Sequence, residues 1–489
     1  MPLEDKDLKQ LEQREIKVAE VLQQLERFRQ GFQPLNLIRP ALVGDGITRL
    51  SAEASDRLMA KFEKEHNSYA IEKFVPASGA ATRMFKLLFE LLSTEKLDKP
   101  LAECVLGTQE ARQFVSGLER FAFYEEWNAL GSIRDLDGRT ALLNLLNSNG
   151  LGYSSKPKAL LAFHRERGQT TSPLFTHALE SLAYAQSRLH FTISEEHRGS
   201  IEAELALLSK QHDWQLEYTF SYQKPSTDTV AVDLKNQLVR GADGKILFRP
   251  AGHGSLIQNL NARKADFVFI KNIDNVCPLR SLNQHNYYKK VIGGMAIEIT
   301  VEIHRYQRLL DEEIDRIDWH ELARFLSVNF GYSLPVGQTN AVSDARDLLF
   351  RPFRVCAMVP NENEPGGGPF WVELNGRETL QIIESAQIDK KNADQLGIMN
   401  QSTHFNPVDM VVSRLDYRGR PYELNDFVDR SQGFIAHKTH AGNPIKALEL
   451  PGLWNGAMAH WNTLFVEVPA ETFNPVKTVL DLLKPSHQA

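Results

Sequence analysis

Cationic side chains stand close to small or apolar residues at two places in this sequence. Residues 74–86, FVPASGAATRMFK, lead from an apolar stretch through small residues to Arg83, and residues 156–164, KPKALLAFH, place Lys158 before an apolar run. Lysine and arginine are the usual ligands of phosphate oxygens, and arginine binds them with a bidentate fork. Together the two segments predict a site for a phosphate-bearing ligand.

The turn in the first segment carries almost no side-chain bulk and consists of Ala77, Ser78, Gly79, Ala80 and Ala81. Its backbone N–H groups can approach phosphate oxygens closely, and the N-terminus of a following helix adds a favourable partial charge. We expect Thr82 to cap that helix and Arg83 to reach a terminal phosphate. Taken alone, the segment fits an ordinary strand-to-helix turn slightly better, and it matches neither the P-loop nor the dinucleotide glycine pattern.

The second segment delivers Lys158 after a rigid Lys-Pro step. An ammonium group at the rim of a sheet can neutralise charge on a reacting phosphate. A Pro-Lys step by itself is common in solvated loops, so this interpretation depends on the pairing with the Thr82-Arg83 turn.

A strongly apolar run, FVFIKNIDNV at 267–276, ends in polar residues that include Asp274. Ligands collect at the carboxyl ends of strands in parallel sheets, and a carboxylate there suits Mg²⁺ on a nucleotide phosphate. The alternative is an Asx turn that only ends the strand. We favour the metal site, with Asp409 in STHFNPVDMVV as a second candidate carboxylate.

Three further segments add candidate contacts. In FRPAGHGSLIQNLN, the glycines around His253 let the backbone pass close to a flat ring, although an ordinary helix-initiating loop fits equally well. The predicted nucleotide contacts there are Gly252, His253 and Gly254. The loop PNENEPGGGPFWVE and the segment HKTHAGNPIK supply the predicted substrate contacts Glu364, Gly367, Lys438 and Lys446. His437 and His440 have no obvious third ligand, so the sequence does not favour a histidine metal site.

The elements that must position these residues follow from hydrophobic periodicity. Residues 5–30 and 51–66 predict helices, and 71–76 predicts a strand. Strands and helices alternate from 170, which predicts an α/β fold of three layers around a mainly parallel mixed sheet. We divide the chain into a helical segment 1–70, an α/β core 71–345 with a helical insertion at about 87–150, and a strand-rich part 346–489.

Composition sets the wider limits. The 489 residues carry a net charge of -6, which argues against a general nucleic-acid binder. Three scattered cysteines, no apolar signal region and no apolar run long enough to cross a membrane lead us to expect a cytoplasmic protein that binds neither nucleic acid nor a membrane.

The order of these motifs resembles the nucleotide-sugar pyrophosphorylases, whose usual signature is Gly-Gly-x-Gly-Thr-Arg followed by Pro-Lys. The GHG loop, the strand ending in NIDN and the closing FNPVK at 473–477 are similar to segments of the UDP-sugar and UDP-N-acetylhexosamine enzymes. From end to end, with the phrases RPAGHG, IKNIDNV and LELPGLWNGAM, the chain resembles a bacterial domain-of-unknown-function family (DUF4301).

The resemblance implies a GT-A-like nucleotidyltransferase fold and an enzyme that joins an NTP, preferably UTP, to a sugar 1-phosphate with release of pyrophosphate. It implies Arg83 on the leaving pyrophosphate, Lys158 on the reacting phosphates, and Mg²⁺ on Asp274 and Asp409. A glycosyltransferase that uses a nucleotide-sugar donor is the alternative. The alanine-rich loop also leaves open a non-catalytic nucleotide-sugar sensor.

Overall fold

The computed structural model describes residues 3–79, 81–166, 168–361, 367–374 and 376–488. The chain forms two compact units. The first comprises Met1–Phe62, Gln223–Phe267 and Ile292–Val468, and the second comprises Glu63–Tyr222, Val268–Val291 and Pro469–Ala489. Both units contain parallel strands and helices, so the predicted α/β class with a mainly parallel sheet is confirmed.

The second unit is built on four neighbouring strands in the order β11-β4-β7-β8, in which β4, β7 and β8 run parallel. Its strands are β4 (Ile71–Pro76), β5 (His164–Glu166), β6 (Gln169–Thr171), β7 (Arg188–Thr192), β8 (Glu217–Ser221) and most of β11 (Phe267–Lys271). Its helices are α4 (Lys86–Thr94), α5 (Gln109–Ser116), α6 (Tyr124–Asn128), α7 (Gly138–Leu146), α8 (Pro173–Tyr184) and α9 (Arg198–His212).

The first unit contains a mainly parallel group in the order β2-β3-β19-β12-β16, and two antiparallel sheets, β1-β13-β14 and β10-β9-β18-β17. Its strands are β1 (Leu37–Pro40), β2 (Leu42–Val43), β3 (Gly46–Thr48), β9 (Thr229–Val232), β10 (Phe248–Arg249), β12 (Phe353–Pro360), β13 (Gly367–Leu374), β14 (Arg377–Glu384), β15 (His404–Phe405), β16 (Asp409–Ser413), β17 (Phe434–His440), β18 (Asn443–Glu449) and β19 (Asn462–Glu467). Its helices are α1 (Asp5–Gln13), α2 (Val18–Gln30), α10 (Ile257–Asn261), α12 (Trp319–Phe330), α13 (Ala341–Leu349) and α14 (Ala393–Asn400). Two helices, α3 (Ala52–Glu65) and α11 (Leu282–Glu312), have residues in both units.

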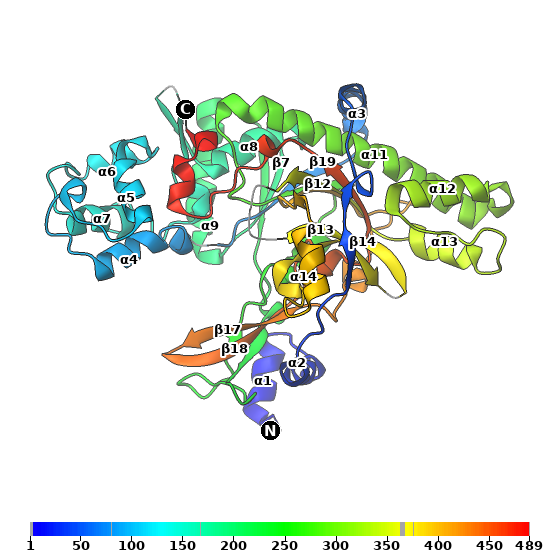
Figure 1. Ribbon diagram of the computed structural model, residues 1–489, viewed down its shortest axis with the longest axis horizontal. Coiled ribbons are helices and arrows are strands. Elements are labelled where there is room, and N and C mark those ends of the chain that lie inside the picture. The colour runs from blue at the N-terminus through cyan, green and yellow to red at the C-terminus, as the bar shows by residue number, and fades with distance from the viewer. Residues whose placement is uncertain (1–2, 80, 167, 362–366, 375, 489) are drawn as a thin grey trace. The chain divides into compact units, whose positions relative to one another are not determined.

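Helix α8 shows how local sequence sets the geometry of the second unit. Ser172 caps it by accepting from the Phe175 N–H, and Pro173 occupies its first turn. Leu174 and Ala178 of α8 share a hydrophobic core with residues of β4 and β7, and α8 and α9 lie beside β7 (Figure 1). The helix is therefore held against the strands whose ends carry the predicted site.

The predicted insertion shares a hydrophobic core with residues before and after it in the sequence. Phe114, Phe123 and Trp127 pack in a cluster with Leu142 and with Val476. The predicted strand at 71–76 is confirmed.

The predicted single helix over 5–30 is wrong, because the chain breaks between α1 and α2. Glu15 adopts a left-handed backbone with φ of 58°, and Ile16 turns inward and is buried. Leu11, Val21 and Leu25 on the two helices contribute to the same core. Because of this break, both short helices pack against the same apolar core. A single straight helix would not follow that core along its whole length.

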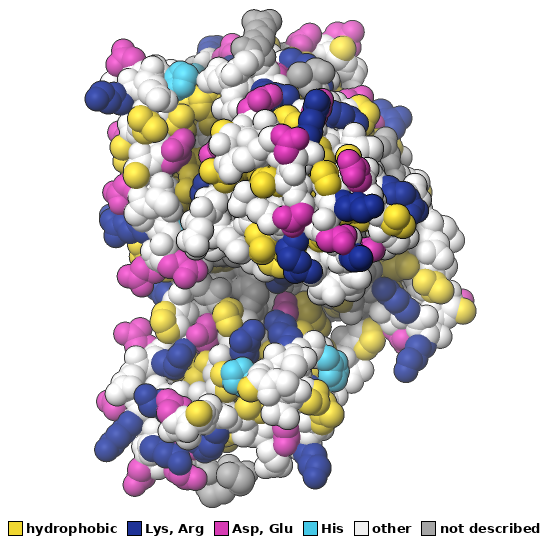
Figure 2. Space-filling view, turned by 90° about the vertical axis from the view of Figure 1, so that its left-hand side faces the viewer, with side chains coloured by type: hydrophobic (Ala, Val, Ile, Leu, Met, Phe, Trp, Pro, Cys, Tyr) yellow, Lys and Arg dark blue, Asp and Glu magenta, His cyan; other side chains and the backbone are white. Residues whose placement is uncertain are grey.

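Basic and acidic side chains are interspersed over the face drawn in Figure 2. Mixed charge of this kind accords with the modest net charge of the chain and gives no extended basic surface on that face. In the described part of the chain, no helix is both long and apolar enough to span a membrane.

Candidate functional site

The segment 74–86 begins in β4 and continues past its carboxyl end. The segment 156–164 contacts the residues that follow β11, through Lys158 and Asp274. Ala77 follows β4 directly and is buried, and its N–H donates to the Thr192 carbonyl at 2.8 Å. Ser78 and Gly79 are exposed, and a Cβ built on Gly79 would have no atom within 4 Å. The turn therefore offers an open backbone surface at Gly79, whereas the amide of Ala77 is engaged in the fold.

Lys158 and Asp274 meet although 116 residues separate them. The Lys158 Nζ lies 3.1 Å from Asp274 Oδ2 and also donates to the Val476 carbonyl at 3.0 Å. The Val476 N–H in turn donates to the Asp274 carbonyl at 3.0 Å. Both charged side chains are half-buried, with 16% and 23% exposed. Three predicted features therefore form one cluster: Lys158, Asp274 and the FNPVK segment, which takes part through Val476.

Arg83 and Thr82 lie in the second unit on a short 3₁₀ turn, Ala81–Arg83, and both are exposed. The expected cap is wrong: α4 begins only at Lys86, and the Thr82 hydroxyl donates to the Ser154 carbonyl at 3.3 Å. Ala81 and Met84 are buried in the core of the insertion, which holds this stretch in a tighter turn before the helix starts.

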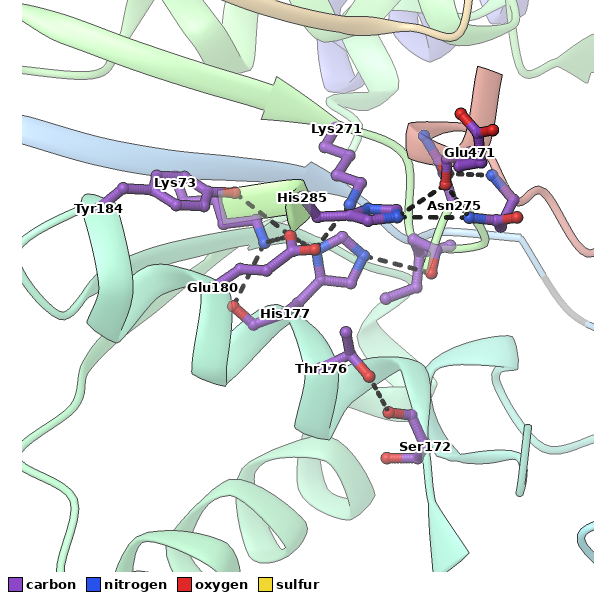
Figure 3. Close-up of polar contacts among 12 residues, drawn as sticks. Lys73, Ser172, Thr176, His177, Glu180, Tyr184, Lys271, Asn275, His285 and Glu471 are labelled. Atoms are coloured by element: carbon purple, nitrogen blue, oxygen red, sulfur yellow. Dashed lines mark hydrogen bonds and ion pairs between the residues drawn. The ribbon is translucent and has the colours of Figure 1, made fainter. Parts of the chain in front are cut away.

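A buried ionic cluster lies beneath these loops (Figure 3). Glu180 on α8 binds Lys73 of β4 and accepts from Lys271 of β11 at 2.6 Å. The Tyr184 hydroxyl donates to the same carboxylate at 3.2 Å, and Lys73 also donates to the His177 carbonyl. All of these side chains are at most 1% exposed, except Tyr184 at 2%. One carboxylate thus joins two strands and a helix without access to water.

The electrostatics of the cluster follow from burial and charge. Burial opposes ionisation of Glu180, but Lys271 and Lys73 hold its pKa well below the usual range. Burial lowers the pKa of Lys73 to about 7, although Glu180 favours its charged form. Burial likewise lowers the pKa of Lys289 well below its usual value and raises that of Cys277 to about 12. The two lysines therefore favour the charged form of Glu180, whereas burial and the Glu180 carboxylate act in opposite directions on the charge of Lys73.

The same helix holds the turn that carries Asp274. The His177 ring nitrogen Nε2 lies 3.3 Å from the Ile273 carbonyl, and the Ile273 N–H donates to the Pro76 carbonyl at the end of β4. The Asn275 side-chain oxygen accepts from the Asn474 N–H at 3.0 Å. Residues before and after Asp274 are thus both fixed, which orients its carboxylate.

The predicted nucleotide contacts Gly252, His253 and Gly254 lie in the first unit. The Leu453 N–H donates to His253 Nδ1 at 3.0 Å, which assigns the ring proton to Nε2, 3.6 Å from Glu384 Oε1. His253 stacks on Trp454 with centroids 3.9 Å apart. A Cβ on Gly254 would lie 2.0 Å from the Pro451 carbonyl oxygen, so this glycine is required for the packing of the 450–458 loop.

Four further predicted residues also lie in the first unit. Gly367 begins β13 and Asp409 begins β16, and both are buried. Lys438 donates to Glu449 at 3.0 Å, and Lys446 bonds the Asn236 side-chain oxygen. The remaining two candidates, Ala80 and Glu364, lie outside the described residues.

No group of three or more His, Cys, Asp or Glu side chains that could hold a metal occurs within the described ranges. Asp274 nevertheless fits Mg²⁺ in one respect, because it is a partly exposed carboxylate with only Oδ2 bonded to Lys158. Magnesium commonly takes one or two protein carboxylates and completes its shell with phosphates and water.

Sequence reasoning missed the Lys73–Glu180–Lys271 cluster. A signal was present: each lysine lies in a strand with apolar neighbours, Lys73 within IEKFVP and Lys271 at the end of FVFIK. A lysine is almost never fully buried unless it is paired, so two such lysines imply a buried carboxylate. The sequence does not indicate that Glu180, on α8, supplies it.

Comparisons with solved structures give low overall similarity. The uridine diphosphate N-acetylglucosamine pyrophosphorylase from Trypanosoma brucei is 15% identical with a TM-score of 0.47, over 95% of this chain and 74% of that one. The UDP-glucose phosphorylase of the same organism is 14% identical with a TM-score of 0.47, over 99% and 80%. A UDP-glucose pyrophosphorylase variant from Leishmania major is 12% identical with a TM-score of 0.46, over 98% and 77%.

A search of functionally curated proteins finds no match. A protein-family model described as a domain of unknown function, DUF4301, matches residues 4–488. The match extends over nearly the whole sequence, through both units and every predicted site segment. The chain therefore belongs to the DUF4301 family.

Proposed function

We propose that this protein is a nucleotidyltransferase that joins an NTP, preferably UTP, to a sugar 1-phosphate. An oxygen of the sugar phosphate attacks the α-phosphorus in line and forms the new P–O bond. The bond from the α-phosphorus to the bridging oxygen breaks, and pyrophosphate leaves. This reaction needs positioning and charge neutralisation more than covalent participation by the protein.

The observation that carries the proposal is the ion pair between Lys158 and Asp274, just after the carboxyl end of β11. A cation and a carboxylate, predicted separately from distant segments, lie 3.1 Å apart, and Ile273, next to Asp274, donates to the Pro76 carbonyl at the end of β4, shortly before the open turn at Gly79. Such a pair suits a ligand that contains both a phosphate and a metal ion. A phosphate oxygen can replace Asp274 as the partner of Lys158, and the Asp274 carboxylate is then free to bind the metal ion. The motif order that resembles the nucleotide-sugar pyrophosphorylases supports the same chemistry.

The roles of the residues follow from their charges. Lys158 neutralises the reacting phosphates, and Arg83, which is exposed, contacts the leaving pyrophosphate. Asp274 would hold Mg²⁺. When bound, the metal would neutralise charge on the phosphates. Ser78, Gly79 and Thr82 line the phosphates.

The test is pyrophosphate release from a panel of NTPs and sugar 1-phosphates with Mg²⁺. Lys158→Ala should lower kcat by about 10²- to 10³-fold, because one positioned donor to developing charge is typically worth that factor. Lys210→Ala, which changes an exposed cation in the last turn of α9, serves as a comparison and should have a much smaller effect. Unchanged pyrophosphate release in active Lys158→Ala protein would refute the role of Lys158.

Product analysis separates the proposal from its alternatives. Release of a free nucleoside diphosphate with transfer of the sugar to an acceptor would identify a glycosyltransferase. Tight binding of a nucleotide sugar without turnover of any pair would identify a sensor.

A further inference from the structure

A cavity of about 410 Å³ lies within the first unit. Its walls come from α2, the stretch 226–229 before and at the start of β9, the turn 254–258, the loop 425–432 and the end of β18. Ligand pockets commonly enclose roughly 300–1,000 Å³. The cavity is therefore large enough for a small molecule.

Helix α2 presents two different faces to the unit. Val21, Leu25 and Phe28 pack into the core formed with β9 and β18. The polar residues that line the cavity, Glu20, Gln23, Gln24 and Arg27, recur at the spacing of one helical face. The N-terminal segment thus supplies a polar wall as well as an apolar anchor.

Three hydroxyl groups on the cavity wall can act only as acceptors toward a ligand. Thr229 donates its hydroxyl proton to the Leu448 carbonyl at 2.8 Å, and Ser255 donates to the Gly252 carbonyl at 2.8 Å. Thr227 donates to the Lys224 carbonyl at 2.6 Å. Because each hydroxyl has one proton and two lone pairs, the groups retain acceptor capacity. The three residues are at most 6% exposed, so they are fixed in place.

Donors complement these acceptors on the other walls. Arg27, whose guanidinium lies 5.6 Å from the Phe32 ring centroid, and Arg430 have only N–H donors, while the carboxamides of Gln23 and Gln258 offer both kinds of group. A ligand group that both donates and accepts matches this arrangement.

The charges on the cavity wall balance. Asp228 is paired with Arg14 at 2.9 Å, and Glu449 is paired with Lys438 at 3.0 Å. Among the residues that the structure describes, the other charged residues of the wall are two carboxylates and two guanidiniums: Glu15, Glu20, Arg27 and Arg430. A phosphate would meet carboxylates and acceptor hydroxyls, and an ammonium ion would meet guanidiniums. The cavity favours a ligand without net charge.

We infer that this cavity binds a neutral polyhydroxylated ligand, a sugar or the sugar part of a larger molecule. Hydroxyl groups both donate and accept, as the walls require, and Phe32 and Ile257 supply apolar surface for the C–H face of a sugar ring. The inference does not rest on the proposed transfer reaction: of the residues predicted to contact phosphate, metal or nucleotide, only Gly254 lines the cavity.

The test measures binding of D-glucose, D-galactose and N-acetyl-D-glucosamine to the full chain by ligand-observed NMR and calorimetry, without nucleotide. At least one sugar should bind, and Arg27→Met and Gln258→Met should each weaken it about fivefold or more. The matched controls Arg29→Met and Gln30→Met change the same residue types in the last turn of α2, where both residues bond Glu26. They should leave the affinity unchanged.

Lys158→Ala separates this inference from the proposed function. Sugar binding that falls in Arg27→Met and persists in Lys158→Ala supports the cavity, whether or not pyrophosphate is ever released. Sugar binding that persists in Arg27→Met and Gln258→Met but is lost in Lys158→Ala assigns the sugar to the transfer site and overturns the inference. Absence of binding by all three sugars, or displacement of a bound sugar by millimolar inorganic phosphate, also overturns it.

Discussion

At the scale of single residues, Glu180 is the most consequential side chain in the second unit. Its carboxylate is the shared partner of Lys73 and Lys271, and all three are withdrawn from water. Removing one member of a buried ion pair leaves an uncompensated charge, which is far more damaging than loss of an exposed pair.

Glu180→Gln should therefore lower the free energy of unfolding by about 3–5 kcal/mol, measured by urea denaturation at pH 7. Adding Lys73→Met should recover part of the loss, because it removes one unpaired charge. The control Glu202→Gln, in the exposed pair with Arg198, should change stability by less than about 1 kcal/mol. Equal effects of the two glutamate variants would contradict the importance of the buried cluster.

The substitution Gly79→Ala tests whether a phosphate binds close to the backbone of the small-residue turn that begins at Ala77. A Cβ there meets no atom within 4 Å, so Gly79→Ala should leave folding intact. A phosphate held by the backbone would meet the new methyl group, and we expect UTP affinity with Mg²⁺ to fall about tenfold, or about 1.4 kcal/mol. Gly199→Ala on α9, which also has open space, is the matched control. Unaltered affinity in Gly79→Ala would exclude close approach at this turn.

At the scale of elements, the C-terminal turn Pro485–His487 is joined to β5 by a pair of buried histidines. His164 Nε2 and His487 Nδ1 are 2.8 Å apart, and the rings stack with centroids separated by 5.1 Å. One nitrogen must donate and the other accept, so the contact requires at least one neutral ring. Burial lowers the pKa of His164 to about 3 and that of His487 to about 4.

This pair should make the protein less stable in mild acid. As the pH falls below about 6.5, the unfolded chain binds protons that the folded pair takes up only near pH 4 and below, so the free energy of unfolding falls across that window. We expect the free energy of unfolding, measured by urea denaturation between pH 7 and 5, to depend less on pH in the double variant His164→Gln/His487→Gln than in the wild type. The two slopes should differ by up to about 2.7 kcal/mol per pH unit.

A packing control separates titration from loss of contacts. Leu483→Ala removes a buried side chain near the same turn and should lower stability at every pH without changing the slope. A double histidine variant with the wild-type pH slope would show that these residues do not titrate on unfolding.

At the scale of the whole molecule, the proposed ligands should raise stability by mass action. UTP with Mg²⁺ at 100 times its dissociation constant should add about 2.7 kcal/mol to the free energy of unfolding. The same UTP concentration with EDTA should give a smaller thermal shift, because Asp274 would then face the triphosphate without the cation. Equal shifts with Mg²⁺ and with EDTA would argue against a metal on Asp274, and a panel of other NTPs tests the preference for UTP.

Parts of the fold were predictable because their signals are local. The strand predicted at 71–76 and the apolar run that begins at 267 become β4 and β11. The helix predicted over 5–30 was wrong because periodicity does not register a single residue in the left-handed region, Glu15. The Thr82 cap was wrong because packing of Met84 in a core made of distant residues delays the helix.

The sequence by itself determined the residue types of the candidate site, the strands that carry them and the family, since each follows from short motifs or from the order of motifs. Only the tertiary structure decided that Lys158 pairs with Asp274 across 116 residues and that Glu180 joins Lys73 and Lys271 across 107 and 91. Partners of buried charges are selected by how strands and crossover helices pack, and hydrophobic periodicity contains no information on that choice.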